Sequence, residues 1–437
     1  MPRDRHIRYW VMAALCIITA LNYIQRNCLG PIETTIREDF RLPPDTTLTG
    51  LAMGIFFFSY ALAQIPSGWL AQKWGPRKAL TLLAASWSLT TIIIAASPGI
   101  YSMIGLRLVL GALQAGIFPC ATLIMASWLP PTRRALGSGL LTASMYAGMA
   151  FVANLTGFLL EPLGWRNLLV LYGAPGIIWA VLFYLWFRDQ PQDHRSVSAQ
   201  ELAAITAGRA ASDEPSARSA KIPWLLLLAS ASMWLICIQQ FFRAGGARFS
   251  DMWLSTYLQE ASLSDIADTA IRKATANHLA SFAGYAGMAG GLIGGWFSDW
   301  VLQRSGSRWM GRNGVAVASL FLMIVCFVPL FIVRDAYVQI VFFCLGAFLG
   351  SGVNSVGYAI SMDVGGKHLF VVFSTMNMVG NLGSMTLTYS FPLFKKLPGG
   401  WTCSLALLVA VHAIALVCWL FLNPNRSIGE ELRPAKT

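Results

Sequence analysis

Long apolar segments recur along the whole chain, and this repetition limits the possible folds more than any other feature. A helix that crosses a lipid bilayer needs roughly 20 predominantly apolar residues. Only structures that satisfy their own backbone hydrogen bonds can cross lipid, so such segments indicate helices. The sequence therefore predicts an all-α membrane protein with twelve transmembrane helices, at about 9–29, 48–71, 78–97, 101–129, 137–160, 167–187, 223–249, 277–301, 313–333, 337–361, 368–393 and 401–422.

Charged residues are scarce, and their distribution predicts the orientation in the membrane. Only 12% of the 437 residues are charged, against about 25% in soluble proteins. If the N-terminus is cytoplasmic, the cytoplasmic segments hold 20 of the 32 lysines and arginines, and the opposite side holds eight. By the positive-inside rule, both termini of this multi-pass chain are expected in the cytoplasm, at the inner (plasma) membrane. The net charge of +12 then needs no nucleic-acid partner.

A polar stretch over residues 188–222, rich in Ser, Ala and Pro, interrupts the apolar pattern. It predicts a cytoplasmic linker between an N-terminal six-helix bundle, residues 1–187, and a C-terminal six-helix bundle, residues 223–437. Within the linker, Ser198 and Glu201 have the spacing of a capping box, which predicts a short helix over about 199–208.

A short internal repeat supports this division into two halves. Gly68-Trp69 closes the second helix of the first half, and Gly295-Trp296 closes the second helix of the other half. Basic residues follow each pair. Parallel six-helix repeats are typical of one large class of secondary transporters, whose substrate site lies near the middle of the membrane.

Several segments carry a resemblance to a known family. The stretch GWLAQKWGPRK at 68–78 resembles the loop motif of the major facilitator superfamily. Other segments resemble its anion:cation symporter family, which includes bacterial sugar-acid (hexuronate) permeases and the sialic-acid and vesicular glutamate carriers. They include NYIQR at 22–26, RLVLGALQAGIFP at 107–119, WLPPTRRA at 128–135 and MDVGGKHLFVVFSTMNMVGNLGS at 362–384.

This resemblance implies a fold and a function. It implies twelve helices in two pseudo-symmetric bundles, and a secondary active transporter that moves a small organic anion, such as a sugar acid or similar carboxylate, by alternating access. It also implies that Tyr23, Arg26, Tyr60 and Asn377 contact the substrate. The chain is expected to act as a monomer.

The residues for ion coupling depart from the family pattern. Sugar-acid permeases of this type carry Asp before the first-helix arginine and Glu seven residues after the fourth-helix arginine. This chain has Gln25 and Gln114 at those positions. Uniport, exchange and sodium coupling therefore stand as alternatives to proton symport, with H+ or Na+ as the coupling ion where there is one.

Four arginines are predicted inside apolar helices, and one of them, Arg248, is expected to snorkel or to pair with Asp251. Counting 1.5 Å per residue, Arg26, Arg107 and Arg243 fall at a similar depth toward the outer face. Charge inside a membrane is costly and usually marks a functional site. A guanidinium binds a carboxylate through two parallel hydrogen bonds, so we interpret the three arginines as substrate-binding residues. The alternatives are snorkelling to the lipid headgroups and, for Arg107, bonding to backbone carbonyls.

Neutral polar residues share helix faces with these arginines or lie on other predicted helices. Gln114 lies two turns from Arg107, and residues four apart also share a face. The alternative for such side chains is hydrogen bonding between helices. The further substrate-binding candidates are Tyr60 with Gln64, Gln114, and Asn377 with Asn381, and the gating candidates near cytoplasmic helix ends are Arg77, Asp299 and Asp363.

Other classes of protein fit less well. A membrane-embedded enzyme needs a catalytic cluster at one depth, but four of the five histidines lie in or next to loops and no metal-ligand spacing appears. We therefore expect neither catalysis nor a cofactor or metal. A non-transporting sensor, the remote alternative, would need an output domain that the short tails do not supply.

Overall fold

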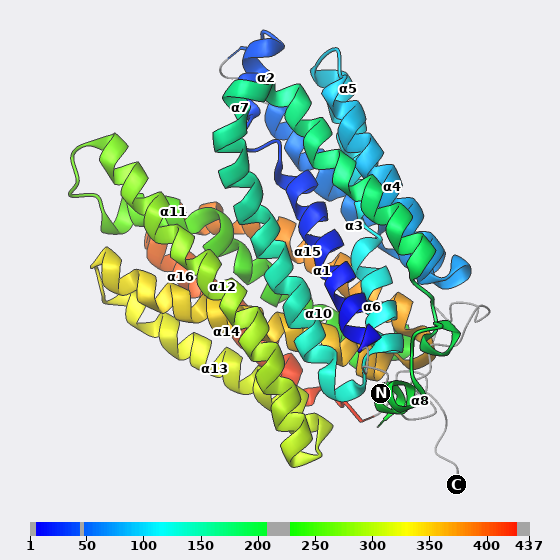
Figure 1. Cartoon of the computed structure of the whole chain (residues 1–437). Helices are drawn as coiled ribbons and strands as arrows, with labels where there is room; N and C mark the ends of the chain where they lie inside the picture. The colour runs from blue at the N-terminus through cyan, green and yellow to red at the C-terminus, as the bar shows by residue number, and fades with distance from the viewer. Residues whose placement is uncertain (1–5, 44–47, 208–227, 426–437) are drawn as a thin grey trace. The chain divides into compact units, whose positions relative to one another are not determined.

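The structure, a computed structural model, describes residues 6–43, 48–207 and 228–425, and these ranges form helices without strands (Figure 1). The chain divides into two compact units. The first comprises Met1–Pro130 with Ser144–Lys221, and the second comprises Pro131–Ala143 with Ile222–Thr437. The short segment Pro131–Ala143 therefore packs with the second unit, although the residues that follow it, Ser144–Lys221, belong to the first unit.

The first unit contains the helices that follow the predicted segments up to residue 187. Its fourth segment is divided between α5 and α6 by a short turn. The long α7 starts in the second unit and contains two helices, joined at Gly164, where φ is 70° and suits glycine. The first unit's helices are α1 (Ile7–Asn27), α2 (Glu33–Asp39), α3 (Leu48–Trp74), α4 (Pro76–Ala95), α5 (Ile100–Gln114), α6 (Ile117–Trp128), α7 (Arg134–Trp186), η2 (Pro191–Asp193) and α8 (Ala199–Thr206). The short η1 (Pro131–Arg133), just before α7, belongs to the second unit.

The second unit contains the remaining helices, and its described residues form three π-helical turns. Two of these turns, η4 and η5, flank the single turn α11. The elements are α10 (Ala231–Arg248), η4 (Phe249–Trp253), α11 (Leu254–Tyr257), η5 (Leu258–Ser262), α12 (Thr269–Ser305), η6 (Trp309–Gly314), α13 (Val315–Phe327), η7 (Val328–Phe331), α14 (Ala336–Gly365), η8 (Gly366–His368), α15 (Leu369–Lys395) and α16 (Trp401–Phe421).

Within the described ranges, nine segments are long and apolar enough to cross a membrane. The regions of α10, α12 and α15 fall short of that criterion but match the other three predicted segments, so the twelve predicted helices all have a counterpart. Two of these helices approach very closely. A Cβ atom at Gly290 of α12 would collide with the backbone of Phe348 in α14, so glycine is required there.

The predicted linker helix is confirmed as α8. The Ser198 hydroxyl accepts a hydrogen bond from Glu201 N at 3.1 Å, as expected for the first half of a capping box. The Glu201 carboxylate does not complete the box. Instead it accepts a bond from Arg8 N at 3.0 Å, which fastens α8 to the start of α1.

Candidate substrate site and gating network

Arg26 lies within a cage of aromatic rings in the first unit. Its guanidinium carbon is 4.2 Å from the ring centre of Tyr60, 4.7 Å from that of Phe56 and 5.0 Å from that of Tyr23. The faces of these rings attract a cation, which offsets part of the cost of burial. The side chain is not snorkelling, because Arg26 is only 9% exposed and is enclosed by α1 and α3.

One edge of the Arg26 guanidinium has no partner among the described residues. Nη1 donates to the Tyr23 hydroxyl at 3.2 Å, but the buried Nε and Nη2 donate to no protein atom there. These two N–H groups point the same way and form the fork that binds a carboxylate or sulfonate through two parallel bonds. A buried donor without a partner costs free energy, so this edge favours an anionic ligand.

Arg107 is bonded differently from Arg26. It is 2% exposed, and it donates from Nε to Ala52 O and from Nη1 to Arg26 O, both at 3.2 Å. Its guanidinium carbon is 4.8 Å from the Phe56 ring centre, so Phe56 contacts both guanidiniums. Arg107 therefore ties α5 to α3 and α1 beside Arg26.

Gln25 and Gln114 are fully buried in the first unit. Gln25 Nε2 donates to Tyr172 O at 2.9 Å and to Ser88 Oγ at 3.3 Å. Gln114 Nε2 donates to Asn22 O at 3.4 Å. Both amides therefore join helices through donor groups that a carboxylate lacks. Gln64, one turn beyond Tyr60 on α3, is also fully buried.

The candidates of the second unit lie on α10 and α15. Arg243 is 8% exposed and donates from Nε to Gln240 Oε1 at 3.2 Å. A Cβ at Gly380 would meet the Gln240 side chain, so Gln240 packs against α15. On that helix, Asn381 donates to Asn377 O at 2.8 Å.

Two predicted gating residues, Asp299 and Asp363, meet in a buried ion-pair network of the second unit. Arg312 bridges them, with Nη1 2.8 Å from Asp299 and Nε 3.0 Å from Asp363. Arg134 Nη1 is 2.8 Å from the other oxygen of Asp363. Asp299 also accepts from Leu136 N at 2.7 Å, at the start of α7. All four charged side chains are at most 2% exposed.

Among the described residues, no three His, Cys, Asp or Glu side chains gather as ligands for a metal ion. The charged groups described above form ion pairs or, in Arg26, leave two buried donors open. Such a constellation, set in membrane-crossing helices of two compact units, is suited to binding and moving a solute.

Comparison with known proteins decides the family. The sequence profile of the Major Facilitator Superfamily matches residues 15–388 of this chain. The chain belongs to the major facilitator superfamily. The recognition made from the sequence motifs is therefore confirmed, and members of this superfamily are transporters rather than enzymes.

Relatives match over almost the full chain. A probable sulfoacetate transporter, SauU of Cupriavidus necator, is 27% identical over 417 residues, which cover 95% of this chain and 94% of that protein. A probable galactarate/D-glucarate transporter, GudP of Escherichia coli K12, is 27% identical over 444 residues, with 97% and 94% covered.

Solved structures show the same fold. The superfamily transporter FucP in its outward conformation has a TM-score of 0.68 at 15% identity, over 94% of this chain and 98% of that chain. The predicted fold class, twelve transmembrane helices of the major facilitator type, is confirmed by this likeness. The protein is thus a multi-pass membrane transporter.

Arg77, in the loop motif, forms hydrogen bonds with residues at or just after the end of α7. Arg77 N donates to Asp189 Oδ1 at 2.7 Å, and Nε donates to Tyr184 O at 2.9 Å. These partners all lie in the first unit, at the start of α4 and the end of α7. The described contacts of Arg77 thus include neither Asp299 nor Asp363.

Some residues of these sites were missing from the sequence-based candidates. Phe56 has no polar atom, and only its position one turn before Tyr60 could have indicated it. Gln240 lies one turn before Arg243, a spacing that places both on one face. Arg134 lies in the predicted cytoplasmic loop after the fourth helix, and Arg312 follows the second loop motif. Basic residues are expected at both places for orientation alone.

Proposed function

We propose that this transporter carries a small organic anion and that the free edge of Arg26 binds the anion's carboxylate or sulfonate. The observation that carries the proposal is the pair of buried Arg26 donors, Nε and Nη2, without a protein partner in the described chain. Tyr23, Phe56 and Tyr60 hold the guanidinium in place, and the aromatic cage leaves only that edge for a ligand.

The relatives support an organic acid as the substrate. Sulfoacetate, galactarate and D-glucarate, named for two of them, all carry a carboxylate, and sulfoacetate also carries a sulfonate. A sugar acid or a similar carboxylate fits these names and the neutral polar side chains near the arginines. We assign Arg107, Gln64 and Gln114 to support of the Arg26 site in the first unit. We assign Arg243, Asn377 and Asn381 in the second unit to substrate contact.

The remaining assignments follow from the same proposal. Asp299 and Asp363 gate the cytoplasmic side through the ion-pair network, and we assign Arg77 to gating at the loop motif, where its described partners are Asp189 and Tyr184. We place both termini in the cytoplasm and the chain, as a monomer, in the inner membrane. Since Gln25 and Gln114 cannot carry protons, uniport, exchange and sodium coupling compete with proton symport.

A thermal-shift screen tests the proposal directly. Purified protein is heated with a panel of carboxylates and sulfonates that includes sulfoacetate and galactarate. A ligand raises the unfolding temperature in proportion to the logarithm of its concentration over its Kd. We expect at least one acid to stabilise wild type and to leave Arg26→Ala unchanged.

The matched control is Arg248→Ala, which removes a guanidinium from α10. Arg248 pairs with Asp251 at 3.1 Å and is about one-third exposed, so its loss is not expected to affect binding. An acid that stabilises wild type and Arg26→Ala equally would contradict the role of Arg26. No response to any organic anion would contradict the substrate class.

A further inference from the structure

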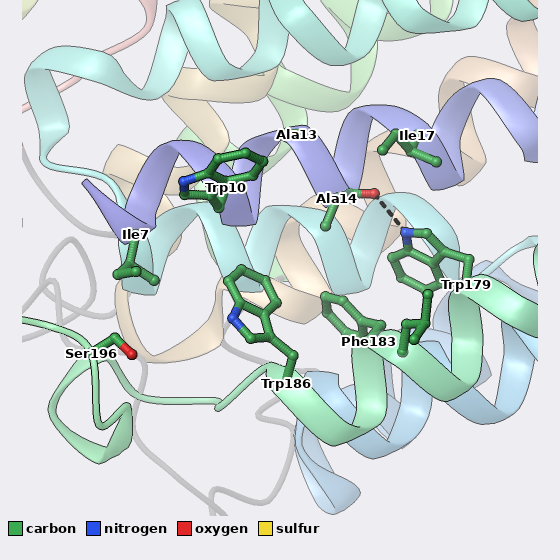
Figure 2. A pocket seen from close by; sticks show the side chains of 10 residues that line it. Ile7, Trp10, Ala13, Ala14, Ile17, Trp179, Phe183, Trp186 and Ser196 are labelled. Carbon is green, nitrogen blue, oxygen red and sulfur yellow. Dashed lines mark hydrogen bonds between the residues drawn. The ribbon is translucent and has the colours of Figure 1, made fainter. Parts of the chain in front are cut away.

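An apolar groove runs along the first unit between α1 and the last turns of α7 (Figure 2). Its volume is about 640 Å³, within the usual range of small-molecule sites. The groove is separate from Arg26 and from the ion-pair network, and neither the family nor the relatives' names assign it a role.

The α1 wall of the groove is a stripe of one helix face, with residues at positions i, i+3, i+4 and i+7. Ala13 and Ala14 form a shallow floor in its middle, and Trp10 and Ile17 stand at its ends (Figure 2). Trp10 and Ile17 are 66% and 54% exposed. Large apolar side chains on a membrane-crossing helix are thereby left facing lipid.

The α7 wall repeats the same spacing with larger side chains, Trp179, Leu182, Phe183 and Trp186. Trp179 stacks on Phe183, with ring centres 4.4 Å apart. The Trp179 indole N–H donates to Ala14 O at 3.1 Å and closes the inner end of the groove (Figure 2). Small residues on one helix and rigid rings on the other thus keep the seam open.

The length of the groove matches one leaflet of a bilayer. It begins where the helices begin and end, at Ile7 and Trp186, and it reaches Ile17. Ten residues of α1 rise about 15 Å, half of a hydrocarbon core of roughly 30 Å. Trp10 and Trp186 lie near the open end, at the level where tryptophans anchor helices at the membrane surface.

The open end of the groove is basic. Ser196 lines it, and the neighbouring Arg195 is exposed to solvent. Arg8, next to Ile7, holds its guanidinium 5.1 Å from the Tyr9 ring centre. The nearby carboxylate of Glu201, on α8, is buried and accepts a hydrogen bond from Arg8 N. Arg8 lies on the side of α1 opposite the groove, so Arg195 supplies the positive charge beside the end at which a lipid headgroup would lie.

We propose that this groove binds one phospholipid with an anionic headgroup, such as phosphatidylglycerol, from the leaflet on the side of α8. One acyl chain lies between the α1 and α7 stripes, and the phosphate lies against Arg195. Basic positions at the membrane surface attract anionic headgroups. A second protein copy fits less well, because the groove is only one leaflet long and its rims are apolar side chains suited to acyl chains.

The groove is tested by filling it. The full-length protein is stripped of lipid in detergent, supplied with phosphatidylglycerol or phosphatidylcholine, and analysed by native mass spectrometry and thermal unfolding. Ala13→Trp fills the floor, and Val181→Trp adds the same ring at an exposed α7 position outside the groove. We expect wild type and Val181→Trp to retain one more phosphatidylglycerol per chain than Ala13→Trp, and to gain thermal stability from it.

The headgroup is tested separately by Arg195→Gln, which we expect to reduce the preference for phosphatidylglycerol over phosphatidylcholine severalfold. Equal phosphatidylglycerol retention by wild type and Ala13→Trp would overturn the site. Equal retention of both lipids by wild type would overturn the anionic headgroup. A dimer in wild type that Ala13→Trp converts to monomer, without any change in lipid, would show that a second copy occupies the groove and would also overturn the proposal.

Discussion

The side-chain amide of Gln25 donates a hydrogen bond to the backbone carbonyl oxygen of Tyr172, with 2.9 Å between the heavy atoms. A second bond, to Ser88 Oγ at 3.3 Å, connects the same nitrogen to α4. Gln25 is fully buried, so its amide joins α1, α4 and α7 inside the first unit. The position therefore has a neutral, structural use in this chain.

This bond predicts the effect of an acid at the same place. In Gln25→Glu, an ionised carboxylate would face the Tyr172 carbonyl without a donor between them, at a cost of about 1–3 kcal/mol for the unsatisfied group. A protonated carboxyl could restore the donor. We therefore expect the variant to unfold at a lower temperature than wild type, and the deficit to grow from pH 5 to pH 8.

Gln25→Met is the control. Methionine has a similar length and no charge, so this variant measures the effect of losing the amide alone. Its stability deficit should not depend on pH over that range. A Gln25→Glu protein with wild-type stability at pH 8 would show that the Tyr172 bond is unimportant.

Arg26 and Arg107 are expected to differ in what their loss affects. Arg26→Lys keeps a charge in the aromatic cage but removes the free fork, so affinity for the anion should fall about tenfold to hundredfold with little change in stability. Arg107→Leu leaves the carbonyls of Ala52 and Arg26 without their donor. We expect it to cost about 1–3 kcal/mol for each unsatisfied carbonyl.

Ligand titration and unfolding in mixed detergent, measured on both variants, separate these effects. A large loss of stability in Arg26→Lys would show that Arg26 is mainly structural. Normal stability in Arg107→Leu would show that the two carbonyls find other donors.

The helices and the burial of Arg26 could be predicted from the sequence, because a long apolar run and a guanidinium inside it each allow few outcomes. Part of the aromatic cage could also be predicted, since Tyr23 lies one turn before Arg26. The partners of Arg107 could not be predicted, because its bonds depend on how α1, α3 and α5 pack. Arg134 and Asp363 lie 229 positions apart, and no local pattern connects them.

Asp363 contacts both arginines of the ion-pair network, Arg134 and Arg312. Asp363→Asn removes the charge that both guanidiniums face. Breaking a buried ion pair by removing one partner typically costs about 3–5 kcal/mol. We expect a loss of this size in the free energy of unfolding, measured in mixed detergent.

Glu260→Gln provides the comparison for this loss at an exposed pair. Glu260 pairs with Lys395, and both side chains are about two-fifths exposed, so the change should cost at most about 1 kcal/mol. Equal losses in the two variants would contradict the assignment of the network as a buried, tightly coupled structure.

The last prediction concerns how pH affects the packing of the linker segment that contains His194 and α8. His194 is buried between the rings of Trp128 and Trp186, at 5.8 and 5.4 Å between ring centres. Its Nδ1 accepts a hydrogen bond from Ser196 N at 3.3 Å, which requires the neutral ring. Burial and then the nearby Arg188 lower the pKa of His194, while Glu201 acts in the opposite direction.

The direction of the pH effect follows from this lowered pKa. When residues 194–206 are released from the rest of the first unit, His194 regains its ordinary pKa near 6.5. Below that pH the released state therefore binds more protons than the docked state. Docking is therefore strongest above about pH 6.5 and weakens as the pH falls. Hydrogen exchange over residues 194–206, corrected for the intrinsic exchange rate at each pH, should show less protection at pH 5.5 than at pH 7.5. His194→Gln, which cannot gain a proton, should show the same protection at both values. If wild type and this variant respond alike, the pH dependence comes from another group, with Glu201 as the first to test.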